Sequence, residues 1–225
     1  MNPRQEFSLE AYRGLLEQAK AAGFAFQSFT DYLAAPRDKL VLLRHDVDVS
    51  LEYALRLAQV ERELQIKSTY FVRLHARFYG LDDADNRRRV RQLADWGFEI
   101  GLHQEAARFV NTMPEVIAFL QRDKARLEDL ICQTVTGVSC HLPKHQFFQM
   151  DDALLAQTGF AYNPGGARFN RDAVFVSDSN RTWKQYSLAE ALDLGDKVLA
   201  NIHPVWWAPG ELEAEAVIRA LLAGE

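Results

Sequence analysis

The sequence lacks the features that mark disulfide-rich, membrane-spanning, secreted and nucleic-acid-binding proteins. Two cysteines in 225 residues are too few for a disulfide framework, and we expect Cys132 and Cys140 to be buried free thiols. No apolar run is long enough to cross a membrane, and the N-terminus lacks the basic-then-apolar pattern of a signal peptide. The formal net charge of -5 argues against a nucleic-acid-binding surface. We therefore expect a cytoplasmic protein with no membrane span and no nucleic-acid partner.

Two further absences concern the domain and its ligands. No Gly-x-Gly-x-x-Gly follows the first clear strand, so a dinucleotide site has no support. No linker rich in proline or serine divides the chain, and 225 residues with 48% hydrophobic content suit one large domain. We predict a single domain over residues 1–225, in which residues 1–38 form an N-terminal helical extension.

Short apolar runs alternate with amphipathic segments along the chain. The predicted strands are residues 40–43, 67–74, 98–102, 135–139, 160–163, 173–176 and 197–202, and the aromatic-rich residues 24–29 are a candidate for a further strand. The predicted helices are residues 8–22, 50–64, 82–96, 114–130, 151–158 and 211–222. This alternation predicts an α/β fold with right-handed crossovers and a mainly parallel sheet. Seven or so strands are compatible with an open doubly wound sheet or with a closed barrel.

The stretch from Leu40 to Ser50 carries the densest group of chemically able residues. Four apolar residues end abruptly in Arg44, His45, Asp46 and Asp48. In an extended segment, Arg44 and the two aspartates share one side and His45 faces the other. Two carboxylates on one side repel unless a cation lies between them or one holds a proton. The alternative is an aspartate that caps the next helix, beside a solvated loop.

Other polar residues also fall just past predicted strands. Three of the six histidines share this placement, and the full set is Asp46, Asp48, His103, Glu105, His141, Asp178 and His203. The carboxyl ends of parallel strands meet at one edge of a sheet or one mouth of a barrel, where ligands bind. We therefore expect these side chains to form one site.

The order of these motifs resembles the polysaccharide deacetylase superfamily, also called NodB homology or carbohydrate esterase family 4. The resemblance is to the divergent branch with an Arg-His-Asp-Val-Asp first motif, and it covers about Leu40 to Trp207. The matching segments are His45-Asp46-Val47-Asp48, Gly101-Leu102-His103, His141-Leu142-Pro143, Asp178 to Trp183, and Leu199 to His203. The resemblance implies a distorted (β/α)7 barrel that binds a divalent metal, with zinc preferred.

The resemblance also assigns roles to individual residues. Asp46 matches the catalytic base, Asp48 and His103 match metal ligands, and His203 matches the catalytic acid. The family's second metal-binding histidine, four residues after the first, is replaced by Ala107. Zinc sites need about three protein ligands and an open position.

The missing histidine leaves the third metal ligand open. His141 stands where the family usually has arginine, and we prefer it to Glu105 as the third ligand. His45 is less suitable because strand alternation turns it away from the site. Weak or absent metal binding is the alternative.

We expect the remaining candidate residues to contact the substrate. These are Arg44, Glu105, Asp178, Trp183 and Trp207. The tryptophans would offer flat faces to a sugar ring, although packing in the core or at the rim suits them equally. Asp178 has a second interpretation as a capping or turn residue.

The resemblance implies a metal-dependent hydrolase of a C–N bond. The favoured reaction is deacetylation of an N-acetylated sugar or glycoconjugate precursor, with the substrate a carbohydrate or other small molecule. One alternative is a catalytically silent relative that binds a carbohydrate or small ligand. The other is a hydrolase of a small non-sugar amide.

Overall fold

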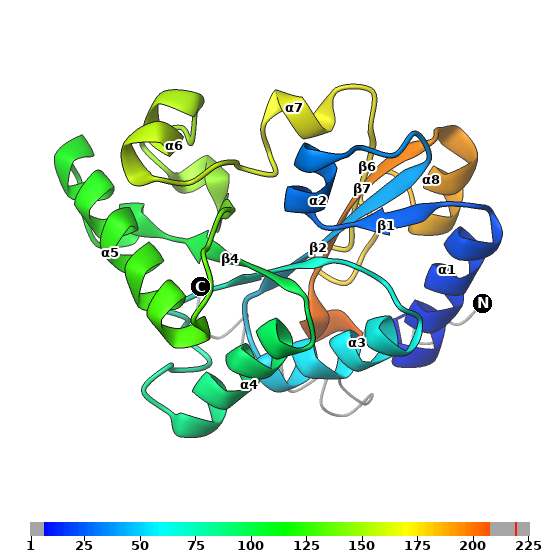
Figure 1. The fold of residues 1–225 in the computed structure, drawn as a ribbon, viewed down its shortest axis with the longest axis horizontal. Coiled ribbons are helices and arrows are strands. Elements are labelled where there is room, and N and C mark those ends of the chain that lie inside the picture. The colour runs from blue at the N-terminus through cyan, green and yellow to red at the C-terminus, as the bar shows by residue number, and fades with distance from the viewer. Residues whose placement is uncertain (1–6, 208–218, 220–225) are drawn as a thin grey trace.

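One parallel sheet of seven strands frames the protein (Figure 1). The computed structural model describes residues 7–207 and 219. The strands are β1 (Ala25–Gln27), β2 (Leu40–Val47), β3 (Thr69–Val72), β4 (Glu99–Gln104), β5 (Val138–Cys140), β6 (Val174–Ser177) and β7 (Lys197–Ile202). Their order is β5-β4-β3-β2-β7-β6, and β1 also pairs with β2. The sheet curls into an incomplete barrel, which confirms the predicted α/β barrel class.

The central strand β2 is longer than the apolar run that predicts it. Its first part, residues 40–42, pairs with β1 on one edge, and residues 44–47 pair with β3 on the same edge. The other edge pairs with β7 over residues 40–45. Arg44, His45 and Asp46 therefore lie within the strand and not in a loop beyond it. The segment interpreted as an N-terminal extension contributes β1 to the sheet.

Helices pack around the curled sheet (Figure 1). They are α1 (Leu9–Ala21), α2 (Phe29–Ala34), α3 (Leu51–Glu63), α4 (Ala84–Asp95), α5 (Met113–Ile131), α6 (Asp152–Thr158), α7 (Ala167–Asn170) and α8 (Leu188–Leu194). Side chains of Ser8, Ser50 and Asp83 cap the first turns of α1, α3 and α4, as serine and aspartate commonly do. The predicted helix at residues 211–222 lies outside the described residues, except for residue 219.

The sequence pattern misplaces three parts of the fold. Helices α2, α7 and α8 are seven residues long or shorter, which is too short for a clear amphipathic repeat. The predicted strand at residues 160–163 is reduced to a single bridge between Tyr162 and Gly137. Pro164 follows directly and has no N–H for a ladder hydrogen bond. Cys132 and Cys140 are free, but Cys132 is exposed at the end of α5.

The two faces of β2 have different surroundings. Leu40 and Leu42 belong to the apolar interior of the barrel together with Phe71 of β3. Val41 and Leu43 pack on the opposite face, in the cluster that includes side chains of α1 and α3. The inner face thus changes from apolar to charged as β2 approaches the mouth of the barrel. No helix within residues 7–207 or at residue 219 is long and apolar enough to cross a membrane.

Candidate functional site

The mouth of the barrel collects the polar side chains that follow the strands. Contacts of 4.0 Å or less join Asp48 to His103, to His141 and to His203. Asp46 lies 3.9 Å from His103. The structure therefore brings together residues from β2, β4, β5 and β7 that are far apart in the sequence, as the strand-end placement predicts.

Asp46 is a buried carboxylate held by an arginine from its own strand. Arg44 Nη2 donates to Asp46 Oδ2 at 2.6 Å, and Arg44 Nε donates to Asn201 Oδ1 at 3.0 Å. Burial alone would raise the pKa of Asp46, but the charges of Arg44, His103 and His203 lower it. Asp46 is therefore ionised at neutral pH. Its other oxygen, Oδ1, is buried and has no hydrogen-bond partner, so it is available to accept a proton.

Asp48 is the residue on which three imidazoles converge. Its Oδ1 atom lies 3.4 Å from His103 Nε2 and 3.7 Å from His141 Nε2, and its Oδ2 atom lies 4.0 Å from His203 Nε2. Burial would raise the pKa of Asp48, but the neighbouring histidines lower it well below its usual range. Asp48 Oδ1 is buried without a hydrogen bond. An orphaned carboxylate oxygen of this kind suits a cation.

The two histidines beside Asp48 have their ring nitrogens in different settings. His103 Nδ1 lies 2.6 Å from Ser139 Oγ, on the neighbouring strand. If that nitrogen carries the proton and donates to Ser139, the Nε2 lone pair faces Asp48. Burial lowers the pKa of His141 to about 4, so His141 is neutral at neutral pH and also has a lone pair to offer.

Arg73 enters the same site from the end of β3. Its Nη2 atom donates to Glu105 Oε2 at 2.6 Å. Its Nη1 atom lies 3.6 Å from Asp48 Oδ1 and 3.4 Å from His141 Nε2. Arg73 is absent from the predicted site because the predicted strand extends through residue 74 and so encloses it. The strand-end rule that identifies the histidines would have found it if the strand had been ended at Val72.

His203 and Asp178 form a separate pair at the end of β7. His203 Nδ1 lies 2.6 Å from Asp178 Oδ1, and the His203 backbone N–H also donates to this carboxylate. Trp207 Nε1 donates to Asp178 Oδ2 at 2.6 Å. Burial would lower the pKa of His203, but the carboxylates of Asp178, Asp46 and Asp48 together outweigh burial and raise the pKa to about 9. His203 is thus an imidazolium at neutral pH and can donate a proton.

Several residues expected to contact substrate lie within the protein instead. Asp178 is completely buried and serves His203, and Glu105 is buried against Arg73. Trp207 is 1% exposed and packs on Phe7 and Tyr12. A side chain covered by protein offers no free face to a sugar, so these placements give no support to substrate contact by Asp178, Glu105 or Trp207, and that role stays a prediction.

The other two expected substrate contacts are partly buried. Trp183 packs against Phe7 and Trp207, and Arg44 points to Asp46. Both make their contacts within the protein, and neither is fully enclosed. His45 turns away from the site, as predicted, and its Nε2 atom lies 2.7 Å from Glu61 on α3.

The donor atoms at this mouth are of a kind that binds metal ions, but they do not form a complete coordination site. In a tetrahedral zinc site with bonds of about 2.0–2.1 Å, neighbouring ligand atoms lie about 3.3–3.4 Å apart. The contact between Asp48 and His103 has this spacing, and the orphaned oxygen of Asp48 supports the fit in chemical kind. As they stand, however, no three His, Cys, Asp or Glu side chains in the described part of the chain are arranged to hold a metal. His141 is the third donor in reach, and Arg73 lies against it.

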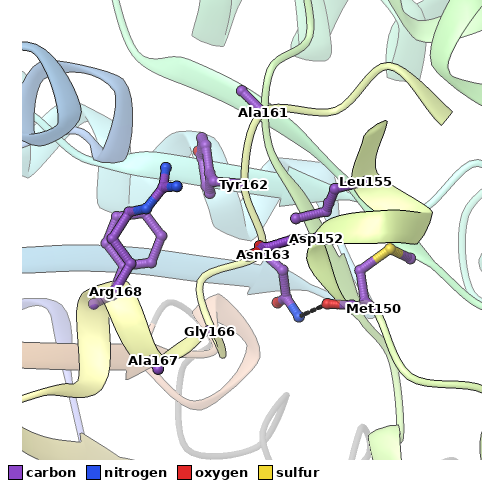
Figure 2. A pocket seen from close by; sticks show the side chains of 10 residues that line it. Met150, Asp152, Leu155, Ala161, Tyr162, Asn163, Gly166, Ala167 and Arg168 are labelled. Atoms are coloured by element: carbon purple, nitrogen blue, oxygen red, sulfur yellow. Dashed lines mark hydrogen bonds between the residues drawn. The ribbon is translucent and has the colours of Figure 1, made fainter. Parts of the chain in front are cut away.

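A cavity of about 120 Å³ lies away from the mouth cluster, between α6 and α7 (Figure 2). Asp152 and Met150 line one side, and Arg168 lies across from them beside Tyr162. Asn163 Nδ2 donates to the Met150 carbonyl at the edge of this cavity. None of the lining residues belongs to the Asp48 cluster.

Comparison with known proteins finds similarity in structure. Neither a protein-family model nor a curated protein sequence matches this chain. A CE4 family pseudoenzyme from Bacillus anthracis superposes with a TM-score of 0.53 at 17% identity, over 84% of this chain and 61% of that protein. The present chain thus spans less than two thirds of that protein.

Two further structural neighbours are a carbohydrate esterase and a chitin deacetylase. A family 4 carbohydrate esterase from Bacillus anthracis has a TM-score of 0.51 at 17% identity, over 92% of this chain and 83% of that one. The chitin deacetylase of the fungal pathogen Colletotrichum lindemuthianum has a TM-score of 0.54 at 13% identity, over 83% of this chain and 81% of that one. At such identities, likeness establishes fold and leaves activity to the site itself. The chain has the NodB-type fold of the family 4 carbohydrate esterases, as its motifs predict.

Proposed function

We propose that this protein hydrolyses an amide bond and releases acetate from an N-acetylated sugar or glycoconjugate precursor. The observation that carries the proposal is the opposite pairing of two groups at one mouth. Asp46 is bound by the Arg44 guanidinium, which favours the carboxylate, and His203 is bound by the Asp178 carboxylate, which favours the imidazolium. Amide hydrolysis needs such a pair, because one group must take a proton from water and another must give one to the leaving amine.

The proposed metal ligands are Asp48, His103 and His141. A divalent metal bound there, with zinc preferred, would polarise the amide carbonyl and lower the pKa of a bound water. Asp48 contributes a buried carboxylate oxygen that accepts no hydrogen bond. His103 is oriented by Ser139, and oriented imidazoles of this kind are typical of metal ligands.

The remaining steps belong to residues of this chain. Asp46 accepts the proton of the attacking water at Oδ1, while Arg44 occupies Oδ2 and holds the carboxylate in place. His203 donates a proton from Nε2 to the departing nitrogen, since Nδ1 is engaged by Asp178. Asp178 then stabilises the imidazole in the tautomer that can be reprotonated at Nε2.

The proposed substrate is a carbohydrate because proteins of similar structure include a carbohydrate esterase and a chitin deacetylase. A cytoplasmic location, which stays a prediction, would favour a glycoconjugate precursor over a cell-wall polymer. Small non-sugar amides belong in the same assay because the site chemistry does not distinguish the amine portion.

The second candidate is a catalytically silent protein that binds a carbohydrate. Two observations favour it. Ala107 stands at the position of the family's second metal-binding histidine, and the Arg73 guanidinium already lies against two of the proposed metal donors. One structural neighbour is itself described as a pseudoenzyme.

Acetate release and metal content together test the proposed function. Wild-type protein prepared with zinc, Asp48→Ala and the exposed control Asp95→Ala would be compared on N-acetylglucosamine oligomers and on small acetamides. We expect wild type and the control to hold zinc and release acetate, and Asp48→Ala to lose both. Equal release by Asp48→Ala would exclude this mechanism. Sugar binding without zinc or acetate release by wild type would favour the silent candidate.

A further inference from the structure

Arg73 has an unusual position among the charged groups of the mouth. It is 4% exposed, and its guanidinium lies between the Glu105 carboxylate on one side and the proposed metal donors on the other. The contact with Glu105 is short, at 2.6 Å. The contacts with Asp48 and His141, at 3.6 and 3.4 Å, are longer than a normal hydrogen bond to these groups. One end of Arg73 is therefore firmly held and the other end is loosely held.

The chemistry of the loosely held end excludes a second cation at the same atoms. A guanidinium has only donors, so its approach to His141 Nε2 uses the lone pair of that nitrogen. A metal ion would need the same lone pair, because imidazole binds metals through an unprotonated nitrogen. The Oδ1 atom of Asp48 faces Arg73 in the same way. Either Arg73 or a metal can use these two atoms fully, but both cannot do so together.

Arg73 also gives the buried carboxylates a counter-charge in the absence of metal. Asp46 has Arg44, and Asp178 has His203. Asp48 and Glu105 share Arg73. Without this cation, the partly buried Asp48 and the buried Glu105 would each lose a neutralising partner, which is costly in a protein interior.

We propose that Arg73 is a built-in cation that competes with a divalent metal for Asp48 and His141, so that metal enters only when the Nη1 end of Arg73 withdraws. Glu105 is the anchor that keeps Arg73 in the site during this exchange. Arg108 Nη1 also contacts Glu105 Oε2 at 2.7 Å, which leaves the anchor partly neutralised when Arg73 shifts. This inference rests on the proposed metal site. It explains why the metal donors are present but do not form a complete coordination site.

Zinc affinity of metal-free protein is the direct test. It would be measured by competition with a chromophoric chelator, and the visible absorption of bound Co²⁺ would report the geometry of the site. The variant Arg73→Gln removes the charge and keeps a hydrogen-bond donor for Glu105. Arg108→Gln is the matched control, because it also removes a guanidinium from Glu105 but lies away from the metal donors. We expect Arg73→Gln to bind zinc at least about tenfold more tightly than wild type, and Arg108→Gln to bind within about twofold of it.

A second variant covers the case in which a lone Glu105 charge prevents folding. Arg73→Gln combined with Glu105→Gln removes one positive and one negative charge together, and circular dichroism would confirm its fold. The same tighter binding is expected. Equal or weaker zinc binding in the folded variants would overturn the competition.

The outcomes separate this inference from the proposed function. If wild type binds zinc and releases acetate but the Arg73 variants bind no more tightly, the competition is wrong and the function stands. If only the Arg73 variants bind zinc, the competition stands and the wild-type chain is the silent candidate. If no variant binds zinc, both the competition and the metal site are wrong.

Discussion

The Nδ1 atom of His203 lies 2.6 Å from Oδ1 of Asp178, and this carboxylate has no exposed surface. The charges of Asp178, Asp46 and Asp48 raise the pKa of His203 to about 9 against the opposing effect of burial. A raised pKa means that folding favours the protonated imidazole. This contribution to stability is complete below the ordinary histidine pKa of about 6.5, and it is lost as the pH rises through about 9.

The first prediction concerns Asp178→Asn. Removal of the carboxylate charge should lower the pKa of His203 from about 9 toward or below its ordinary value. An NMR titration of the His203 ring in metal-free protein measures this directly. A variant titration that coincides with the wild-type curve would mean that another group holds the proton on His203.

The second prediction concerns Arg44→Gln. Loss of the guanidinium beside Asp46 should raise the pKa of Asp46, because an adjacent positive charge favours the carboxylate. The acid limb of the acetate-release profile should therefore move to higher pH. Arg88→Gln, on an exposed pair with Asp85, is the control, and its profile should match wild type. An unmoved acid limb in Arg44→Gln would remove Asp46 from the role of base.

The third prediction concerns the buried carboxylate of Glu61. It accepts hydrogen bonds from Tyr12, Ser68 and Tyr70 and lies 2.7 Å from His45. Glu61→Ala leaves these partners unpaired and should lower the free energy of unfolding by about 3–5 kcal/mol. Urea denaturation measures the change.

A matched glutamate on the same helix provides the control for Glu61. Glu52 forms an exposed pair with Arg56, and Glu52→Ala should cost about 1 kcal/mol or less. Similar losses for the two variants would show that the buried network contributes no more than a surface pair.

The fourth prediction concerns two glycines. A methyl group on Gly101 of β4 would overlap the Phe71 ring, so Gly101→Ala should destabilise the fold by about 1–3 kcal/mol. Gly14 in α1 has open space around its Cα, and Gly14→Ala should stabilise by about 0.5–1 kcal/mol. Thermal unfolding of both variants tests the sign of each effect, and a stable Gly101→Ala would contradict the close packing of β3 on β4.

Local periodicity predicts much of this structure correctly. The alternation along β2 separates Arg44 and Asp46 from His45, and the strand-end rule brings His103 and His203 to the same mouth. These inferences succeed because they depend on backbone geometry within one element and on parallel pairing. The same alternation predicts the α/β class and a parallel sheet, and the barrel comes from the family resemblance that the motif order carries.

Long-range packing explains what the sequence analysis misses. The burial of Trp207 depends on Phe7 and Tyr12 near the other end of the chain, and composition alone does not separate a packed tryptophan from an exposed one. The ion pair between Arg73 and Glu105 joins two loops, and the spacing of residues in the sequence does not predict it. The prediction of a strand at residues 160–163 is wrong because hydrophobic residues there indicate burial, and burial does not by itself require hydrogen-bonded pairing with another strand.

The alternation of β2 also constrains how this chain can evolve. A one-residue slip would send His45 into the mouth and place Arg44 and Asp46 against α1 and α3. The same slip would damage both the site and the fold, since the site would lose its base Asp46 and Glu61 would lose its contact with His45. Single-residue insertions and deletions should therefore be tolerated in the loops around β2 and rejected within it, even where every individual substitution in the strand is mild.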